Sequence, residues 1–199
     1  MNIQEIQIPV GTSKIIGDLT LISNSTSLVV FAHGSGSSRF SSRNQFVAKI
    51  LNQAQISTFL FDLLTQEEEA IDVYTREFRF DIPLLASRLV LITNWLRNNQ
   101  DTANIRLGYF GASTGAGAAL IAAAQIPNQI SAVVSRGGRP DLAGQFLPKV
   151  QSPTLLIVGE LDIEVIELNQ FAYDKLTCIK ELAIVPNATH LFEEPGTLE

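Results

Sequence analysis

Short apolar runs alternate along the chain with segments whose apolar residues recur at helical spacing. Residues 3–8 and 14–21 alternate apolar and polar side chains with a period of two, which predicts an edge hairpin that turns at residues 10–12. Six later runs are apolar over the length of a strand, as in strands buried on both faces. These runs are 27–33, 57–64, 104–110, 130–137, 153–159 and 180–186.

Helical patterns lie between these runs, at residues 43–52, 81–98, 113–125 and 164–175. This alternation predicts an α/β fold with a mostly parallel sheet and helices on both faces. We expect the charged segment 65–80 to be a surface loop or a short lid. In open sheets of this kind, ligands bind beyond the C-terminal ends of the strands. The residues that follow each apolar run are therefore the candidates for chemistry.

The composition narrows the classes of function. A length of 199 residues, with 46% hydrophobic and 17% charged residues, predicts one domain with a sizeable core. The net charge of −6 disfavours nucleic acid and anionic membranes as partners. No signal peptide is visible, no apolar stretch approaches the roughly 18 residues of a membrane span, and Cys178 is the single cysteine. We therefore expect a cytoplasmic protein with a small-molecule substrate, and the sequence leaves its oligomeric state open.

The stretch GYFGASTGAG at residues 108–117 allows two interpretations. A phosphate-binding loop needs G-x-x-x-x-G-K-[ST], and no lysine follows the glycines here. The residues 111–115 instead fit G-x-S-x-G, in which Ser113 is a nucleophile on a strained turn between a strand and a helix. Gly111 and Gly115 provide the small neighbours that such a turn needs. Because a tight packing turn can produce the same short motif, the rest of the chain has to decide.

Two residues near later strand ends supply what a nucleophilic serine requires. His190 follows the last apolar run, where a general base can reach a serine at the same edge of the sheet. Asp162 follows the run 153–159 and would orient the imidazole. Glu160 is the competing acid, and we prefer Asp162 because Glu160 lies closer to the strand. The chain order Ser113, Asp162, His190 is that of an α/β-hydrolase.

The second histidine lies in the glycine-rich stretch that follows the run 27–33. In an α/β-hydrolase this loop supplies one amide of the oxyanion hole, and the residue after the nucleophile supplies another. We assign these amides to Ser35 and Thr114. For His33 we expect a structural role in the loop rather than a role as a base.

With these residues in place, the sequence resembles the α/β-hydrolase superfamily, and within it the dienelactone-hydrolase-like branch. It is similar to a group of small bacterial hydrolases that also occurs fused to phosphoribosyltransferase domains. The resemblance implies an eight-stranded sheet and hydrolytic chemistry, and it carries Ser113, Asp162 and His190 into the roles of a catalytic triad. The matching segments span almost the whole chain: FAHGSGSSRFSSRNQFVAKILN, TFLFDLLTQEEE, RLGYFGASTGAGAAL, VSRGGRPDLAG, LLIVGELDIEVIELN and VPNATHLFEEPGTLE.

Two departures from the family pattern limit what the resemblance implies. Dienelactone hydrolases proper use a cysteine nucleophile, whereas position 113 is serine and Cys178 precedes the last strand. The dienelactone substrate is therefore not transferred. Relatives also carry a further helix after the segment that ends here at Glu199. We expect residues 1–199 to form a single α/β-hydrolase domain without that C-terminal helix, and the intervals between strands are too short for a large cap domain.

Arginines near the same edge of the sheet are candidates for substrate binding. Arg136 and Arg139 follow the run 130–137, and a cation there would suit a carboxylate or phosphate. The alternative is that one of them pairs with Asp141 and braces the loop. Arg43 and Asn44 similarly either reach the site or simply begin a helix that is capped by Ser42.

These observations lead to one expected function and to rivals from other classes. We expect a serine hydrolase that cleaves an ester, thioester or lactone of a small molecule through an acyl-enzyme on Ser113. The same residues would support an acyltransferase. A non-catalytic binding or regulatory module on the hydrolase fold is the rival outside catalysis. No metal-binding cluster and no cofactor-binding loop is evident in the sequence, so we expect no cofactor.

Overall fold

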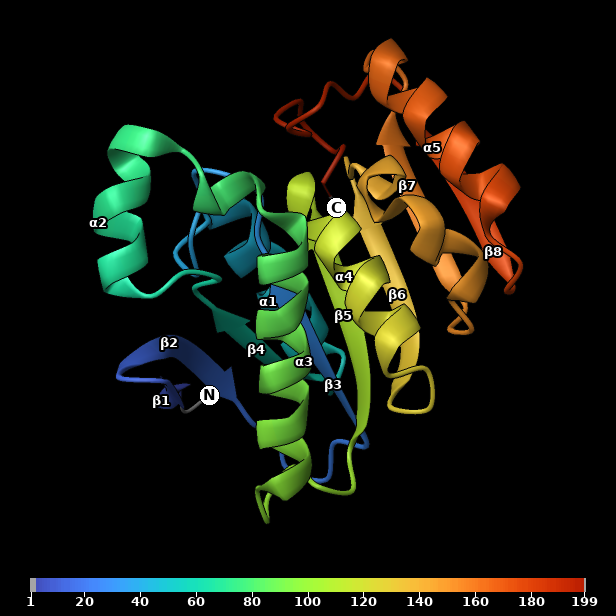
Figure 1. Cartoon of the computed structure of the whole chain (residues 1–199). Coiled ribbons are helices and arrows are strands. Elements are labelled where there is room, and N and C mark those ends of the chain that lie inside the picture. Colours follow the sequence, from blue (N-terminus) through green and yellow to red (C-terminus); the bar gives the residue numbers. More distant parts are fainter. Residues whose placement is uncertain (1–2, 199) are drawn as a thin grey trace.

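The computed structural model describes residues 3–198, which form one eight-stranded sheet with helices on both faces (Figure 1). The strand order is β1-β2-β4-β3-β5-β6-β7-β8. The β1–β2 and β2–β4 pairs are antiparallel, and the remaining pairs are parallel. The predicted α/β fold is therefore confirmed. The strands are β1 (Ile3–Val10), β2 (Ser13–Thr20), β3 (Ser27–Ala32), β4 (Ser57–Phe61), β5 (Arg106–Ala112), β6 (Ile130–Arg136), β7 (Thr154–Gly159) and β8 (Lys180–Val185).

The four predicted helices are present, with ends shifted by one residue at most. Helices α3, α4 and α5 lie in front of the sheet in Figure 1, and α1 packs on the opposite face. Helix α4 is rich in alanine and glycine, so it approaches β5 and β6 closely and is buried almost throughout. The helices are α1 (Ser42–Gln53), α2 (Gln66–Thr75), α3 (Ile82–Asn98), α4 (Thr114–Gln125) and α5 (Ile163–Lys175), with 3-10 segments η1 (Phe78–Phe80) and η2 (Pro140–Lys149).

Residues 65–80, which we expected to be a surface loop or a short lid, are mostly helical, so the prediction of a loop is wrong. Thr65 and Glu68 form a capping box, in which each side chain accepts a hydrogen bond from the other residue's backbone amide. At the other end, the fully buried carboxylate of Asp72 pairs with Arg79 and also accepts from the amides of Phe78 and Arg79. These polar contacts hold α2 in place, and Phe78 of η1 also packs against the core.

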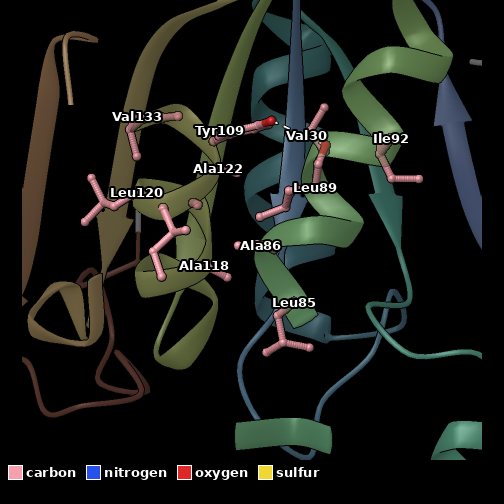
Figure 2. Packing of buried hydrophobic residues seen from close by; sticks show 14 of the residues in the cluster. Val30, Leu85, Ala86, Leu89, Ile92, Tyr109, Ala118, Leu120, Ala122 and Val133 are labelled. Carbon is pink, nitrogen blue, oxygen red and sulfur yellow. Dashed lines mark hydrogen bonds between the residues drawn. The ribbon is translucent and has the colours of Figure 1, made fainter. Parts of the chain in front are cut away.

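Buried side chains form a large cluster on one face of the sheet and a small one on the other. The large cluster joins β-strand residues to α3 and α4, and Leu89, Tyr109 and Leu120 lie within it (Figure 2). The small cluster consists of Phe31, Ala48, Leu60 and Phe110, packed beneath α1. Alternation along the strands separates the two clusters, because neighbouring residues of a strand point to opposite faces.

The parallel strands place five chain segments at one edge of the sheet. The C-terminal ends of β3, β5, β6, β7 and β8 meet there, and each continues into a loop that contains a residue singled out by the sequence. This edge is where the candidate site forms.

Candidate active site

Ser113 occupies the sharp turn between β5 and α4. Its φ of 50° and ψ of −125° lie in a region that residues other than glycine rarely adopt, at a cost of about 1–3 kcal/mol. A strained turn of this kind raises the side chain above the end of the sheet. Ser113 is partly exposed and lines a cavity of about 240 Å³.

Glycine is required on both sides of Ser113 because backbone atoms crowd these positions. A Cβ atom on Gly111 would lie 2.4 Å from the Cα atom of Ala116. A Cβ atom on Gly115 would lie 2.3 Å from the carbonyl oxygen of Ala32. Both distances are too short for any side chain, so the small neighbours expected from the motif are needed for the packing of α4 against β5 and β3.

Asp162 and His190 are joined by a hydrogen bond at the same edge. Asp162 is the residue before α5, and His190 lies in the segment after β8. The ring Nδ1 of His190 donates to Oδ2 of Asp162 at 2.6 Å. Because Nδ1 is engaged, Nε2 is the ring nitrogen left for proton transfer. His190 lines the same cavity as Ser113.

The segment that carries His190 is braced by a residue that the sequence analysis missed. The carboxylate of Glu194 accepts from the Thr189 hydroxyl at 2.6 Å and from the Thr189 amide at 3.1 Å. These hydrogen bonds close a tight loop around His190 and hold the pKa of Glu194 below its usual value. The five-residue interval between a threonine and a glutamate is too common in sequences to have indicated this brace.

Glu160, the competing acid, is engaged away from His190. Its Oε2 accepts a hydrogen bond from the amide of Asn187 at 2.9 Å. Glu160 therefore connects the β7–α5 turn to the segment that follows β8, while Asp162 binds the imidazole of His190.

The two expected oxyanion-hole residues lie against each other. The amide of Ser35 donates to Oγ1 of Thr114 at 2.9 Å, and Thr114 is the first residue of α4. Ser35 lines the cavity. The preceding residue, Gly34, lies close to Ser113, because a Cβ atom on Gly34 would lie 3.0 Å from the Cβ atom of Ser113. A substrate oxygen that accepts a hydrogen bond from the Ser35 amide has to share this amide with the Thr114 hydroxyl or displace the hydroxyl from it. The sequence did not reveal this contact.

His33 has the structural role that we expected. Its Nδ1 donates to the carbonyl oxygen of Gly34 at 2.9 Å, and its Nε2 accepts from the amide of Leu63 at 3.1 Å. The Nδ1 hydrogen bond lies within the loop after β3, and the Nε2 hydrogen bond ties this loop to the loop after β4. Burial lowers the pKa of His33, which matches the neutral ring that these two hydrogen bonds require.

Arg136 and Arg139, which the sequence could not tell apart, differ in surroundings. Arg139 donates twice to the carboxylate of Asp141, at 2.8 Å each, which is the bracing pair considered as the alternative. Arg139 is not among the residues that line the cavity, whereas Arg136 is. Arg136 is buried, and one of its Nη atoms donates to Oδ1 of Asn44 at 3.2 Å.

Arg43 and Asn44 both begin α1 and reach the cavity. The cap of this helix is Ser41 rather than Ser42, because the hydroxyl of Ser41 accepts from the amide of Asn44. Arg43 lines the cavity and also pairs with the exposed Glu193 at 3.1 Å.

We searched the described residues for a membrane-spanning helix and for a cluster of metal-binding side chains. Across residues 3–198, no helix is both long and apolar enough to cross a membrane. Over the same residues, no group of three or more His, Cys, Asp or Glu side chains is arranged to hold a metal ion.

Comparisons with known proteins identify relatives over nearly the whole chain, although no family model matches the sequence. A solved dienelactone hydrolase from Anabaena variabilis is 57% identical, with a TM-score of 0.97, over 99% of this chain and 91% of that chain. Est1E from Butyrivibrio proteoclasticus shares the fold at 14% identity, with a TM-score of 0.80, over 96% and 91% of the two chains.

Two curated relatives from strains of Mycobacterium tuberculosis carry the name "Putative phosphoribosyl transferase". Each is 56% identical over 196 residues, which are 98% of this chain and 43% of the relative. The chain thus spans less than half the length of these relatives.

Proposed function

The chain belongs to the dienelactone-hydrolase-like branch of the α/β-hydrolase superfamily, and from this premise we propose that it is a serine hydrolase. Its substrate is an ester, thioester or lactone of a small molecule, and the reaction proceeds through an acyl-enzyme on Ser113. One observation carries the proposal: Ser113 and His190 line one cavity, and Asp162 binds the far ring nitrogen of His190 at 2.6 Å.

The first half-reaction forms the acyl-enzyme. Nε2 of His190 removes the hydroxyl proton of Ser113 as Oγ attacks the carbonyl carbon, and the carbonyl electron pair moves to its oxygen. The amides of Thr114 and Ser35 donate to this oxyanion, each such donor being worth about 2.7–4 kcal/mol in related chemistry. When the tetrahedral intermediate collapses, the leaving group takes the proton from the imidazolium of His190. Asp162 stays ionised and stabilises the charged ring.

The second half-reaction returns the enzyme to its starting state. His190 removes a proton from water as the water oxygen attacks the acyl carbon, and the resulting intermediate expels Oγ of Ser113, which regains the proton from the ring. The acid product then leaves the cavity. A cavity of about 240 Å³ is of a size that suits a small acyl group.

Two names among the relatives are not extended to this chain. The nucleophile here is serine, so the family's dienelactone substrate is left aside. The name "Putative phosphoribosyl transferase" describes relatives of which this chain spans only 43%, so we do not assign that activity to the chain.

Steady-state hydrolysis tests the proposal. Across a panel of p-nitrophenyl esters, thioesters and lactones, at least one compound should be turned over with saturation kinetics. Ser113→Ala should lower kcat/KM for that compound by roughly 10³-fold or more, with an unchanged circular dichroism spectrum. Wild-type-like turnover in folded Ser113→Ala would contradict the proposal.

A further inference from the structure

Arg136 is a buried cation at the end of the strand next to the nucleophile. It pairs in register with Ala112 of β5, the residue that directly precedes Ser113. Only 7% of Arg136 is exposed. Its Nε has no hydrogen-bond partner, and no carboxylate within residues 3–198 lies within ion-pairing distance of its guanidinium.

Three other arginines that are largely shielded from solvent have carboxylate partners. Arg88, which is 8% exposed, pairs with Glu68. Arg39 pairs with Asp18 and Asp62, and Arg79 pairs with the buried Asp72. A buried charge without a partner is costly, because desolvation is not offset by attraction. Arg136 bears this cost at the edge of the candidate site, which suggests that its partner is a ligand.

The charges around Arg136 favour an anion over any other ligand. Besides Arg43, Arg136 and His190, the cavity is lined by small or polar residues and by Leu191, and none of the lining residues is acidic. Burial, followed by the nearby charge of Arg43, lowers the pKa of Arg136 to about 10. The guanidinium remains charged at neutral pH, and a bound anion would relieve both effects.

Two neighbours hold the guanidinium in place. Oδ1 of Asn44 accepts from Nη2 of Arg136 at 3.2 Å, and the ring of Phe192 lies 5.6 Å from the guanidinium carbon. Asn44 belongs to the first turn of α1, so the positive end of this helix also points to the cavity. The arginine is therefore pre-organised rather than free to seek an acidic partner elsewhere.

We propose that the cavity selects anionic substrates, and that Arg136 binds a carboxylate or phosphate group of the compound whose carbonyl Ser113 attacks. This inference rests on the proposed hydrolase function and names its substrate class. Arg136 and Ser113 line the same cavity, so an anionic group on Arg136 and the carbonyl attacked by Ser113 can belong to one small molecule. Arg43 also lines the cavity but is paired with Glu193, which leaves Arg136 as the main anion-binding group, and Asn44 is a positioning residue.

A kinetic comparison tests the selectivity. The ratio of kcat/KM for p-nitrophenyl hemiglutarate to that for neutral p-nitrophenyl butyrate should be high in the wild type. Arg136→Gln should reduce this ratio on the order of 10- to 100-fold, the loss expected for a charge-assisted hydrogen bond. Arg136→Lys should retain part of it. Arg106→Gln, at the opposite end of β5, is the matched control and should leave the ratio unchanged. An equal ratio in the wild type and Arg136→Gln would overturn the proposal.

A binding measurement separates this proposal from the hydrolase function. With Ser113→Ala protein, which cannot turn over, calorimetry with glutarate and with inorganic phosphate should show that at least one of them binds. The anion that binds identifies the source of the charge, and the signal should vanish in the Ser113→Ala, Arg136→Gln double variant. Anion binding without turnover of any ester would refute the hydrolase and keep the anion site. Ester turnover without binding of either anion would refute the anion site and keep the hydrolase function.

Thermal unfolding shows whether Arg136 is merely structural. Removing an unpaired buried charge should leave Tm unchanged or raise it in Arg136→Gln, whereas Tm should fall if the residue mainly supports the fold. A lower Tm together with an unchanged substrate ratio would overturn the proposal.

Discussion

Two carboxylates near the end of β7 lie two residues apart, yet their side chains have separate tasks. Asp162 accepts from the imidazole of His190, and Glu160 accepts from the backbone of Asn187. Of these two acids, Asp162 is the one that orients the imidazole.

Exchange of each acid for its amide tests this division. Asp162→Asn should lower kcat/KM by roughly 10³- to 10⁴-fold, because an amide neither enforces the required tautomer nor stabilises the protonated ring. Glu160→Gln keeps an oxygen that can accept from Asn187, so it should change kcat/KM little. Matched kinetics on the ester found in the substrate panel would measure both. A larger loss in Glu160→Gln would show that the acid has been assigned wrongly.

His33 should make stability depend on pH. Burial lowers the pKa of the folded ring below the unfolded value of 6.5, although the charge of Asp62 partly opposes this shift. As pH falls below 6.5, His33 becomes protonated in the unfolded chain but stays neutral in the folded protein until a lower pH. The free energy of unfolding therefore decreases. The contribution is at most about 1.4 kcal/mol per pH unit.

Urea unfolding at pH 7.5, 6.5 and 5.5 would measure this effect. Between the two lower values the wild type should lose more stability than His33→Gln, by at most about 1 kcal/mol. Parallel losses in the two proteins would mean that His33 is not responsible. The comparison uses slopes, so it holds even if His33→Gln is less stable at every pH.

The sequence predicted those site residues whose place is set by the path of the backbone. It did not predict those whose role depends on the direction of the side chain. Ser113, Asp162 and His190 each follow a strand, so topology alone brings them to one edge. Nothing local distinguishes Arg136 from Arg139, because only the packed structure shows that Asp141 takes one of them and leaves the other buried.

At the scale of secondary structure, apolar periodicity predicted the eight strands and four of the helices. It failed for α2, whose apolar residues Ile71, Val73 and Tyr74 are exposed. The end signals of this helix are polar, and the T-x-x-E sequence of its capping box was the clue available in the sequence. The pairing of Asp72 with Arg79 is a tertiary contact that no periodic pattern records.

The contact between α4 and β3 should limit both stability and activity. In Gly115→Ala, the added methyl group would collide with the carbonyl oxygens of Ala32 and His33, at 2.3 and 2.5 Å. We expect the free energy of unfolding to fall by about 1–3 kcal/mol, as in other overpacked sites. Because α4 carries Ser113 and Thr114, the same shift should reduce kcat/KM on the order of 10²-fold.

Gly108→Ala is the control for this change, since it lies in β5 and its Cβ would meet an ordinary contact at 3.4 Å. Chemical unfolding and ester kinetics on both variants would test the argument. It fails if Gly115→Ala is as stable and active as Gly108→Ala.

At the scale of the whole molecule, the two faces of the sheet contribute unequally to stability. The larger cluster contains α3, α4 and the central strands, whereas four buried residues form the smaller cluster under α1. Leu89 lies in the larger cluster and is fully buried (Figure 2).

Leu89→Ala should therefore lower the free energy of unfolding by about 2–5 kcal/mol through lost burial and a residual cavity. Ile71→Ala on the exposed side of α2 should change it by less than about 0.5 kcal/mol. Denaturant unfolding of both variants would measure the difference, and similar values would contradict this view of the core.

The distribution of charge also belongs to the whole molecule. The chain carries a net charge of −6, but the lining of the cavity contains two arginines and no acid. The composition led us to expect no polyanionic partner, and it could not reveal two arginines in a cavity of an acidic protein. This segregation is a property of the fold.

Covalent labelling tests whether Ser113 is a nucleophile. Folded protein would be incubated with a fluorophosphonate, and the modified residue located by peptide mass spectrometry. We predict one adduct per chain, on Ser113, which is absent in Ser113→Ala and strongly slowed in His190→Gln. No adduct on Ser113 in the folded wild type, or equal labelling of Ser113→Ala, would contradict the claim.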